Sequence, residues 1–313
     1  MTASSLQVAA KPDTIHSIDL SGARMATPDT FETYRSYLFS IAYRMLGSVM
    51  DAEDLVQETY LRYQSAAPAN ILSLKAYLTT ILTRLSIDQL QLAYRQRETY
   101  LGPWLPEPII TGGGTASNVE DNAVMRESLS VAFLSMLERL QPVERAVFLL
   151  REVFDYDYPD IAEFVGRKQA ACRQIFSRAK KRLAEQRRLA AASPEENRRL
   201  LQAYLQAVRA GDGEGLRNIL AEDITLIADG GGKVAGAALY PVTGQLEVAQ
   251  FSIGASRRFL PSAYDTEFTE INHQPAAIAR VGDRAIVVMT VEIEDGRVRI
   301  VRFMANPDKL RHL

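Results

Sequence analysis

The chain has 313 residues, a length that suits two or three domains, and its 47% hydrophobic and 24% charged content is ordinary for a soluble globular protein. The net charge of −2 excludes a uniformly basic nucleic-acid coat, although it allows a local basic face. The single cysteine, Cys172, excludes an internal disulfide and fits a reducing cytoplasm. No apolar run approaches the ~18–20 residues of a membrane span, so we expect no membrane partner.

The first hundred residues predict a tail followed by a helical domain. Residues 1–27 carry no signal-peptide pattern and predict a flexible tail. From Phe31 to Leu46, apolar residues recur at helical spacing as far as Gly47, and Ser48-Val-Met-Asp51 then matches a capping box that begins a second helix. After a proline-containing loop at 65–73, a third helix is expected from about Leu74 to Tyr100.

Residues 101–123 predict a linker, rigid at first and flexible afterwards. Its first part, GPWLPEP, holds the only tryptophan, Trp104, among three prolines. Each proline fixes φ and disfavours helix in the preceding residue, so this stretch should be extended and close to polyproline II. The following ITGGGTASN has the composition of a flexible segment.

The rest of the chain predicts a second helical domain and then an α+β domain. Helical patterns cover about 124–139, 142–152, 158–165 and 169–188, followed by two more helices at 195–210 and 212–220. Beyond them come short stretches rich in Val, Ile, Thr and Phe, and the turns Gly282-Asp283 and Asp295-Gly296 indicate hairpins. The last third is therefore expected to contain a curved antiparallel sheet.

The stretch YPDIAEFVGRKQAACRQIFSRAKKRL, residues 158–183, has the pattern of a helix-turn-helix with its turn at Gly166. Between Gly166 and Arg188 there are nine cations and one anion, a concentration that suits phosphate contact. Base reading needs Arg, Gln or Asn near the start of the second helix, and Gln169, Arg173 and Gln174 are the candidates. The alternative is a solvated basic helix in an ordinary bundle.

A second pattern, DAEDLVQETYLRY at 51–63, places Asp51, Asp54, Gln57 and Glu58 opposite a buried stripe. Its plainer interpretation is an acidic first turn that favours the helix dipole.

Two stretches of the chain resemble a known family. YRSYLFSIAYRMLGSVMDAEDLVQETYLRY is similar to region 2 of bacterial sigma factors of the extracytoplasmic-function type, and LERLQPVERAVFLLREVFDYDYPDIAEFVGRKQAACRQIFSRAKKRL resembles their region 4. GPWLPEP, DGGGK (229–233) and NPDKL (306–310) resemble motifs of the subgroup with a C-terminal SnoaL-like domain. The resemblance runs from about residue 28 to the C-terminus.

The resemblance implies a multidomain fold. Two all-α domains, region 2 at 28–100 and region 4 at 124–190, would be joined by the linker at 101–123. An α+β NTF2-like cone with a curved antiparallel sheet would follow at 195–313. The implied partners are the core of RNA polymerase, through its β′ clamp helices and β flap, and promoter DNA. We expect a monomer when the protein is free.

The resemblance also implies roles for individual residues. Polymerase contacts would come from Asp51, Asp54, Gln57 and Glu58. Contacts near the minus-ten element would come from Asn70, Lys75, Arg84, Arg95 and Arg97. The duplex of the minus-thirty-five element would be read by Arg167, Lys168, Gln169, Arg173, Gln174, Ser177, Arg178 and Lys181. Lys168 stands where many members have a capping Ser or Thr, and its side chain cannot accept that bond.

The subgroup motifs imply contacts between domains. The residues concerned are Trp104, Leu105, Pro106, Asp229, Lys233, Asn306, Pro307, Asp308 and Lys309. Our hypothesis is that Trp104 packs against the SnoaL-like domain or region 2 and fixes the two DNA-binding domains relative to each other. The alternative is that it caps the helix ending near Tyr100.

An enzyme remains an alternative, because SnoaL-like relatives include isomerases and cyclases that use a pocket Asp, His or Tyr. Asp229, Tyr240, Tyr264 and Asp265 are candidate pocket groups, while histidine is limited to three residues. No spacing pairs these groups, so we assign no catalytic residue, metal or cofactor. The sequence also allows a sensor that binds a small ligand in the pocket, and it allows a conventional helix-turn-helix repressor.

Overall fold

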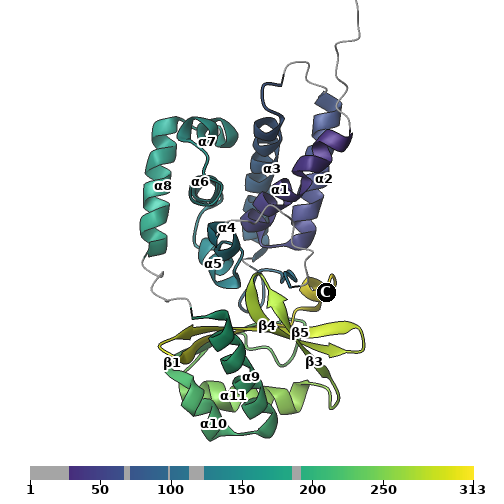
Figure 1. Cartoon of the computed structure of the whole chain (residues 1–313), viewed down its shortest axis with the longest axis vertical. Coiled ribbons are helices and arrows are strands. Elements are labelled where there is room, and N and C mark those ends of the chain that lie inside the picture. The colour runs from purple at the N-terminus through teal and green to yellow at the C-terminus, as the bar shows by residue number, and fades with distance from the viewer. Residues whose placement is uncertain (1–27, 67–70, 98, 113–122, 185–191) are drawn as a thin grey trace, which may run out of the picture.

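The computed structural model describes residues 28–66, 71–97, 99–112, 123–184 and 192–313. The predicted tail at 1–27, residues 113–122 of the linker and Asn70 lie outside these residues. In Figure 1 a helical part lies at one end of the molecule and an α+β part at the other, with the extended linker between them.

The helical part consists of two domains. In the first helical domain, a hairpin of α1 and α2 packs against α3; their bounds are Pro28–Leu46, Val49–Ala66 and Leu74–Arg97. The second helical domain contains α4 (Ala123–Glu127), α5 (Val131–Leu137), α6 (Pro142–Glu152), α7 (Tyr158–Val165) and α8 (Gln169–Ala184).

The prediction of a single helix over 124–139 is wrong, because the helix is interrupted between α4 and α5. The hydroxyl of Ser130 accepts a hydrogen bond from the backbone N–H of Phe133 and so caps the start of α5. At the end of α4, the guanidinium of Arg44 donates to the Met125 carbonyl (2.7 Å) and the Ser128 hydroxyl (2.8 Å). These contacts replace helical bonds that a continuous helix would make.

The two helical domains share one core. Buried apolar side chains form a continuous cluster from Phe31 in α1 to Leu183 in α8. Two buried arginines each donate hydrogen bonds to the other helical domain. Arg44 of α1 binds the α4 segment, and Arg145 of α6 donates to the Met45 carbonyl at 2.7 Å. A guanidinium buried in this way is stable only because its N–H groups find acceptors. The two domains are therefore in direct contact.

The α+β domain is built on one six-stranded sheet. Its helices are α9 (Pro194–Ala210), α10 (Gly213–Ile219), α11 (Gln245–Phe259) and the 3-10 helix η2 (Pro307–Leu310). The strands are β1 (Leu220–Asp229), β2 (Val242–Thr243), β3 (Asp265–Ile271), β4 (Gln274–Val281), β5 (Arg284–Glu294) and β6 (Arg297–Met304). Their order is β2-β1-β6-β5-β4-β3, and neighbours are antiparallel except for β1 and β6, which are parallel. The predicted fold class is confirmed, and the parallel pair and α11 add to it.

The two faces of this sheet have different covers. Helices α9, α10 and α11 pack on one face, away from the helical part (Figure 1). The opposite face receives Leu105 and Ile110 from the linker and Val131 from α5, which pack with sheet residues such as Val288. The linker is thus a structural layer between the sheet and the helical domains.

Leu105→Ala tests the linker as part of this core. Leu105 is buried, and truncating a buried leucine costs about 2–5 kcal/mol because a cavity remains. We expect a loss of that size in the free energy of unfolding, measured by urea denaturation. Leu72→Ala, at a fully exposed leucine, is the control and should change the free energy by less than about 0.5 kcal/mol. Equal effects of the two substitutions would contradict a buried linker.

Candidate functional site

The acidic surface predicted on the second helix lies on the outer side of α2. Asp54 and Gln57 are exposed, Asp51 and Glu58 are half-buried, and Glu58 pairs with Arg62 at 2.7 Å. The buried residues of α2, which include Ala52, Leu55 and Val56, face α1 and α3 instead. The structure thus brings the four predicted polymerase-binding residues together on one open face.

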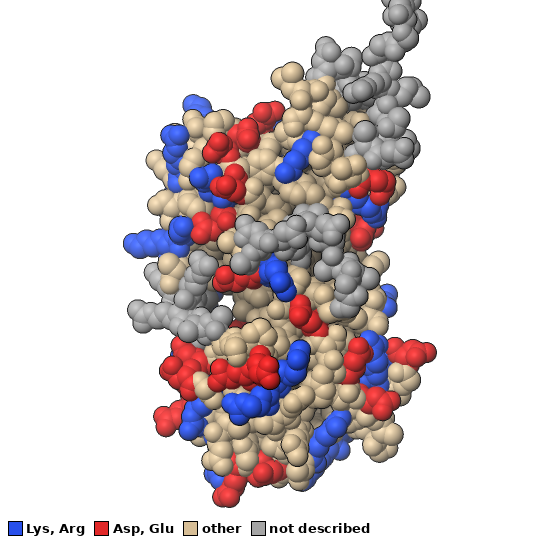
Figure 2. Space-filling model, in the orientation of Figure 1, with Lys and Arg blue, Asp and Glu red and all other residues tan. Residues whose placement is uncertain are grey.

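The predicted duplex-reading residues lie along α8. Helix α7 ends at Gly166, whose φ of 63° lets the Arg167 N–H bond back to the Ala162 carbonyl, and α8 begins at Gln169 without a Ser or Thr cap. The exposed residues of the set are Arg167, Lys168, Arg173, Gln174, Ser177, Arg178 and Lys181, whereas Gln169 is half-buried. Lys and Arg side chains accordingly gather on the side of the molecule that α8 forms (Figure 2).

Two of the predicted minus-ten residues of α3, Arg84 and Lys75, lie at the boundary between the two helical domains and make contacts there. Arg84 donates to the carbonyls of Glu163 (2.9 Å) and Phe164 (3.2 Å) at the C-terminal end of α7. Lys75 lies over the ring of Tyr37, with its ammonium 4.1 Å from the centroid. Arg95 is exposed, and the Arg97 side chain lies outside what the structure describes.

Tyr37 belongs to the same boundary between the helical domains. Its hydroxyl donates to the Tyr156 hydroxyl at 2.6 Å, and the Tyr156 oxygen lies 3.3 Å from that of Thr79 in α3. Burial, together with the neighbouring Tyr156, raises the pKa of Tyr37 far above its ordinary value. The tyrosine therefore stays neutral and keeps its donor.

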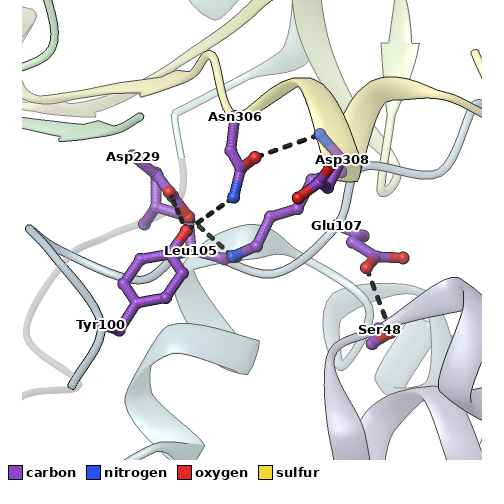
Figure 3. A network of polar contacts seen from close by, with 8 residues as sticks. Ser48, Tyr100, Leu105, Glu107, Asp229, Asn306 and Asp308 are labelled. Atoms are coloured by element: carbon purple, nitrogen blue, oxygen red, sulfur yellow. Dashed lines mark hydrogen bonds and ion pairs between the residues drawn. The ribbon is translucent and has the colours of Figure 1, made fainter. Parts of the chain in front are cut away.

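The subgroup motifs meet at a buried carboxylate, Asp229, at the end of β1. Its Oδ2 accepts from the backbone N–H of Leu105 at 2.8 Å and from the ammonium of Lys309 at 2.7 Å. Its Oδ1 accepts from the Tyr100 hydroxyl at 2.5 Å, and that hydroxyl also accepts from the Asn306 amide at 2.9 Å. We call Tyr100, Leu105, Asp229, Asn306 and Lys309 the clamp (Figure 3). It ties the linker to the α+β domain.

Charge and burial reinforce the clamp. Asp229 is fully buried and Lys309 nearly so, and the ammonium also donates to the Leu105 carbonyl at 2.5 Å. Burial and the hydrogen bond to Asp229 raise the pKa of Tyr100 well above its ordinary value, so its hydroxyl remains a donor. Lys233 and Asp308, which the motifs assigned to contacts between domains, pair with each other at the surface of the α+β domain. Lys233 holds the pKa of Asp308 below its usual range.

The same linker reaches the start of α2. The ring of Trp104 passes so close to Gly47 that a Cβ there would lie 2.6 Å from it, and the Lys309 ammonium lies 4.1 Å from the ring centroid. The Glu107 carboxylate accepts from the backbone N–H of Val49 at 2.6 Å and from the Ser48 hydroxyl at 3.1 Å (Figure 3). A carboxylate at this end of α2 satisfies open N–H groups and favours the helix dipole.

Sequence reasoning missed Glu107 as a cap, although it lies within the GPWLPEP stretch. It also missed Tyr100 as a clamp residue, because the helix expected to include it ends at Arg97. Of the two remaining residues predicted to make contacts between domains, Pro106 is buried beside Gly47. Pro307 opens η2 within the α+β domain.

The candidate pocket residues do not converge. Tyr264 and Asp265 line an open cleft of about 680 Å³ with Arg209 and Arg280, whereas Asp229 lies in the clamp. Tyr240 is exposed and is absent from the cleft lining. Among the described residues, no three His, Cys, Asp or Glu side chains gather as a metal site requires, and no described helix is long and apolar enough to cross a bilayer.

Comparisons with known proteins show which families the two helical domains match. Residues 30–97 match the family described as Sigma-70 region 2, and residues 130–183 match Sigma-70, region 4. The chain is 35% identical over 288 residues to ECF RNA polymerase sigma factor SigJ of Mycobacterium tuberculosis, covering 89% of this chain and 91% of that protein. It is 28% identical to the probable ECF RNA polymerase sigma factor SigI of the same species over 285 residues, 90% of this chain and 93% of that one.

A solved structure is similar over most of the chain. The crystal structure of the M. tuberculosis extracytoplasmic function sigma factor SigJ is similar with a TM-score of 0.70 and 32% identity, covering 91% of this chain and 98% of that chain. The similarity therefore includes the α+β domain as well as the two helical domains. The chain belongs to the extracytoplasmic-function (ECF) sigma factors of RNA polymerase.

Proposed function

We propose that this sigma factor directs RNA polymerase to promoters and that its α+β domain restrains it in a closed arrangement. The proposal rests on the linker. The backbone of Leu105 is bonded to Asp229 in the clamp, and Glu107, two residues later, caps α2. A change in the α+β domain would therefore reach the docking helix through three residues of stiff chain. The protein would act in the cytoplasm as a monomer until it meets the core enzyme.

The docking step falls to α2. Its open face carries Asp51, Asp54, Gln57 and Glu58, and the β′ clamp helices of the core enzyme are the proposed partner. Complementary charge raises the rate of encounter and fixes the orientation of docking. Because this face is already exposed, docking needs no prior opening.

Promoter reading falls to α8 and α3. The exposed Arg173 and Gln174 are proposed to read base edges of the minus-thirty-five element in the major groove, with the flanking lysines and arginines on phosphates. The second helical domain would rest on the β flap. Lys75, Arg84, Arg95, Arg97 and Asn70 are proposed to serve the minus-ten element.

The closed arrangement conflicts with simultaneous reading of both elements. Their names place them about 25 base pairs apart, which corresponds to about 85 Å of B-form DNA. The helical domains share a core, and Arg84 is bonded to the end of α7, so α3 cannot reach one element while α8 reads the other. Promoter binding therefore requires the helical domains to separate and Arg84 to be released.

The α+β domain is proposed to act through contacts and without catalysis. Asp229, the most buried of the candidate acid–base groups, has its oxygens engaged by Tyr100, Leu105 and Lys309. Tyr264 and Asp265 share a cleft that is open to solvent, and neither Asp229 nor Tyr240 joins them there. These placements favour a regulatory role.

Transcription in vitro tests the function itself. Core polymerase with the wild-type chain, supplied with a library of genomic fragments, should give start sites that are absent with core alone. Lys309→Met should give the same start sites in several-fold higher yield, because the restraint is weakened. Failure to direct any start site would contradict the sigma function, and an unchanged yield would contradict only the restraint.

Neutralising the acidic face of α2 should weaken binding to core polymerase. In Asp51→Asn, Asp54→Asn, Glu58→Gln, we expect the Kd measured by biolayer interferometry to rise about tenfold or more, since each 1.4 kcal/mol lost is a factor of ten. The matched control is Glu195→Gln, Glu222→Gln, Asp283→Asn, which removes three exposed carboxylates from the α+β domain. If both triple variants bind core with the affinity of the wild type, α2 does not dock through these charges.

Breaking the clamp should destabilise the chain far more than breaking a surface pair. Lys309→Met leaves the Asp229 carboxylate buried without a counter-charge, which costs about 3–5 kcal/mol in the free energy of unfolding. Hydrogen exchange should also rise at Val49 and Met50, the N–H groups that Glu107 caps.

Two further variants serve as controls for Lys309→Met. Lys233→Met breaks only the exposed pair with Asp308 and should cost less than about 1 kcal/mol. The double variant Asp229→Asn, Lys309→Met removes both charges and should recover part of the loss. If the exchange of Val49 is unaffected in all three variants, the linker does not couple the clamp to α2.

A further inference from the structure

The turn between β3 and β4 lies in an unusual place for a hairpin tip. Ile271 pairs with Gln274, so Asn272 and His273 form a two-residue loop, and both have positive φ, 51° and 57°. Asparagine is among the residues that tolerate this conformation. Loop tips normally lie at the surface, yet Asn272 has no exposed area. The tip is inserted into the helical part.

The side chain of Asn272 joins three segments that are far apart in sequence. Its Nδ2 donates to the hydroxyl of Tyr43 in α1 at 2.8 Å and to the carbonyl of Leu129, between α4 and α5, at 2.8 Å. Its Oδ1 accepts from the N–H of Ile109 in the linker at 2.9 Å. One amide from the α+β domain therefore contacts both helical domains and the linker.

The chemistry of these partners fixes the orientation of the amide. The Leu129 carbonyl can only accept, and the Tyr43 hydroxyl donates its own proton to the Glu107 carbonyl at 2.6 Å. Both partners therefore need a donor, and the amide NH₂ supplies two, while the Ile109 N–H needs the oxygen. An aspartate has the same shape but offers no NH₂ group.

The backbone of the turn makes a separate set of bonds to the linker. The N–H of Asn272 donates to the Ile109 carbonyl at 2.9 Å, and the N–H of His273 donates to the Thr111 hydroxyl at 2.9 Å. Ile110 pairs with Ile271 in a β-bridge. A variant that keeps this backbone but lacks the amide would therefore keep much of the linker contact and lose the contacts to the helical domains.

We propose that Asn272 is a positioning residue of the closed state, whose amide holds the first helical domain, the second helical domain and the linker together on the α+β domain. The proposal rests on the proposed function, in which closure restrains promoter binding. Without the amide, Tyr43 and the Leu129 carbonyl lose a buried partner, and the two helical domains separate more readily.

The experiment measures the distance between the helical domains directly. Spin labels on cysteines at Glu32 in α1 and Ala184 in α8, both exposed, report it by double electron–electron resonance in the full chain with Cys172→Ala. Asn272→Gly suits the positive φ and removes only the side chain. We expect the ratio of open to closed molecules to rise about tenfold, since the two buried hydrogen bonds from the amide to the helical domains are lost.

Two further variants and a control make the result specific. Asn272→Asp should open the chain at least as much, because a carboxylate oxygen would face the Leu129 carbonyl. Tyr43→Phe should open it by removing one acceptor of the amide. The matched control is Asp295→Gly in the β5–β6 turn, where Asp295 has a φ of 50° but is exposed; it should leave the distances unchanged.

The outcomes separate this inference from the proposed function. Unchanged distances in both Asn272 variants would overturn it, as would an equal opening in Asp295→Gly, which would make the effect a general one of sheet turns. Longer distances in Asn272→Gly, Asn272→Asp and Tyr43→Phe, with unchanged distances in Asp295→Gly, would support it. If such variants open but yield no more transcript than the wild type, the positioning role stands and the restraint of transcription fails.

Discussion

A carboxylate that is buried away from water requires hydrogen-bond donors or a counter-charge. Asp229 is such a carboxylate, and its partners come from segments far apart in the sequence. Its oxygens are satisfied by Tyr100, by the backbone of Leu105 and by Lys309, which come from the linker and from η2 near the C-terminus. Burying such a pair gains little net stability compared with apolar packing, but leaving one charge without the other is costly. The clamp therefore contributes specificity, because the observed position of the linker on the sheet satisfies these groups together.

The position of the linker in turn determines what the helical domains can do. Leu105 and Ile110 fill the face of the sheet opposite α9 and α11, and the intervening Glu107 caps α2. The same face receives Val131 of α5, so both helical domains are drawn onto one surface. This sheet face therefore serves as a binding surface for the protein's own segments.

The sequence made much of the fold predictable because local rules and tertiary packing agree there. Gly166 suits the turn before α8, and the acidic residues of α2 repeat opposite its buried stripe, so both surfaces follow from residue type and spacing. Helix α11 was not predicted, and the β1–β6 pair is parallel. Strand direction depends on long-range topology, which short stretches do not encode.

The polar contacts between domains were the least predictable part. The motifs pointed to Asp229 and Lys309, yet their pairing links residues 80 positions apart. The family resemblance assigned Arg84 to DNA, and in the closed chain it bonds to the end of α7. Asn272, which contacts both helical domains and the linker, was not among the predicted contacts between domains. Hairpin chemistry specifies the conformation of a turn, whereas its burial depends on which surfaces the rest of the chain brings to it.

The distribution of open and engaged surfaces suggests an order of events. The docking face of α2 and the basic face of α8 are exposed in the closed chain, while Lys75 and Arg84 of α3 are occupied at the boundary with the second helical domain. Under the proposed function, core polymerase would bind α2 without disturbing the shared core. Engagement of the minus-ten element by α3 would then break contacts that hold the helical domains together. Because a ligand shifts an equilibrium only by its differential affinity for the two states, the core enzyme and promoter together must favour the open state by more than the clamp and Asn272 favour the closed one.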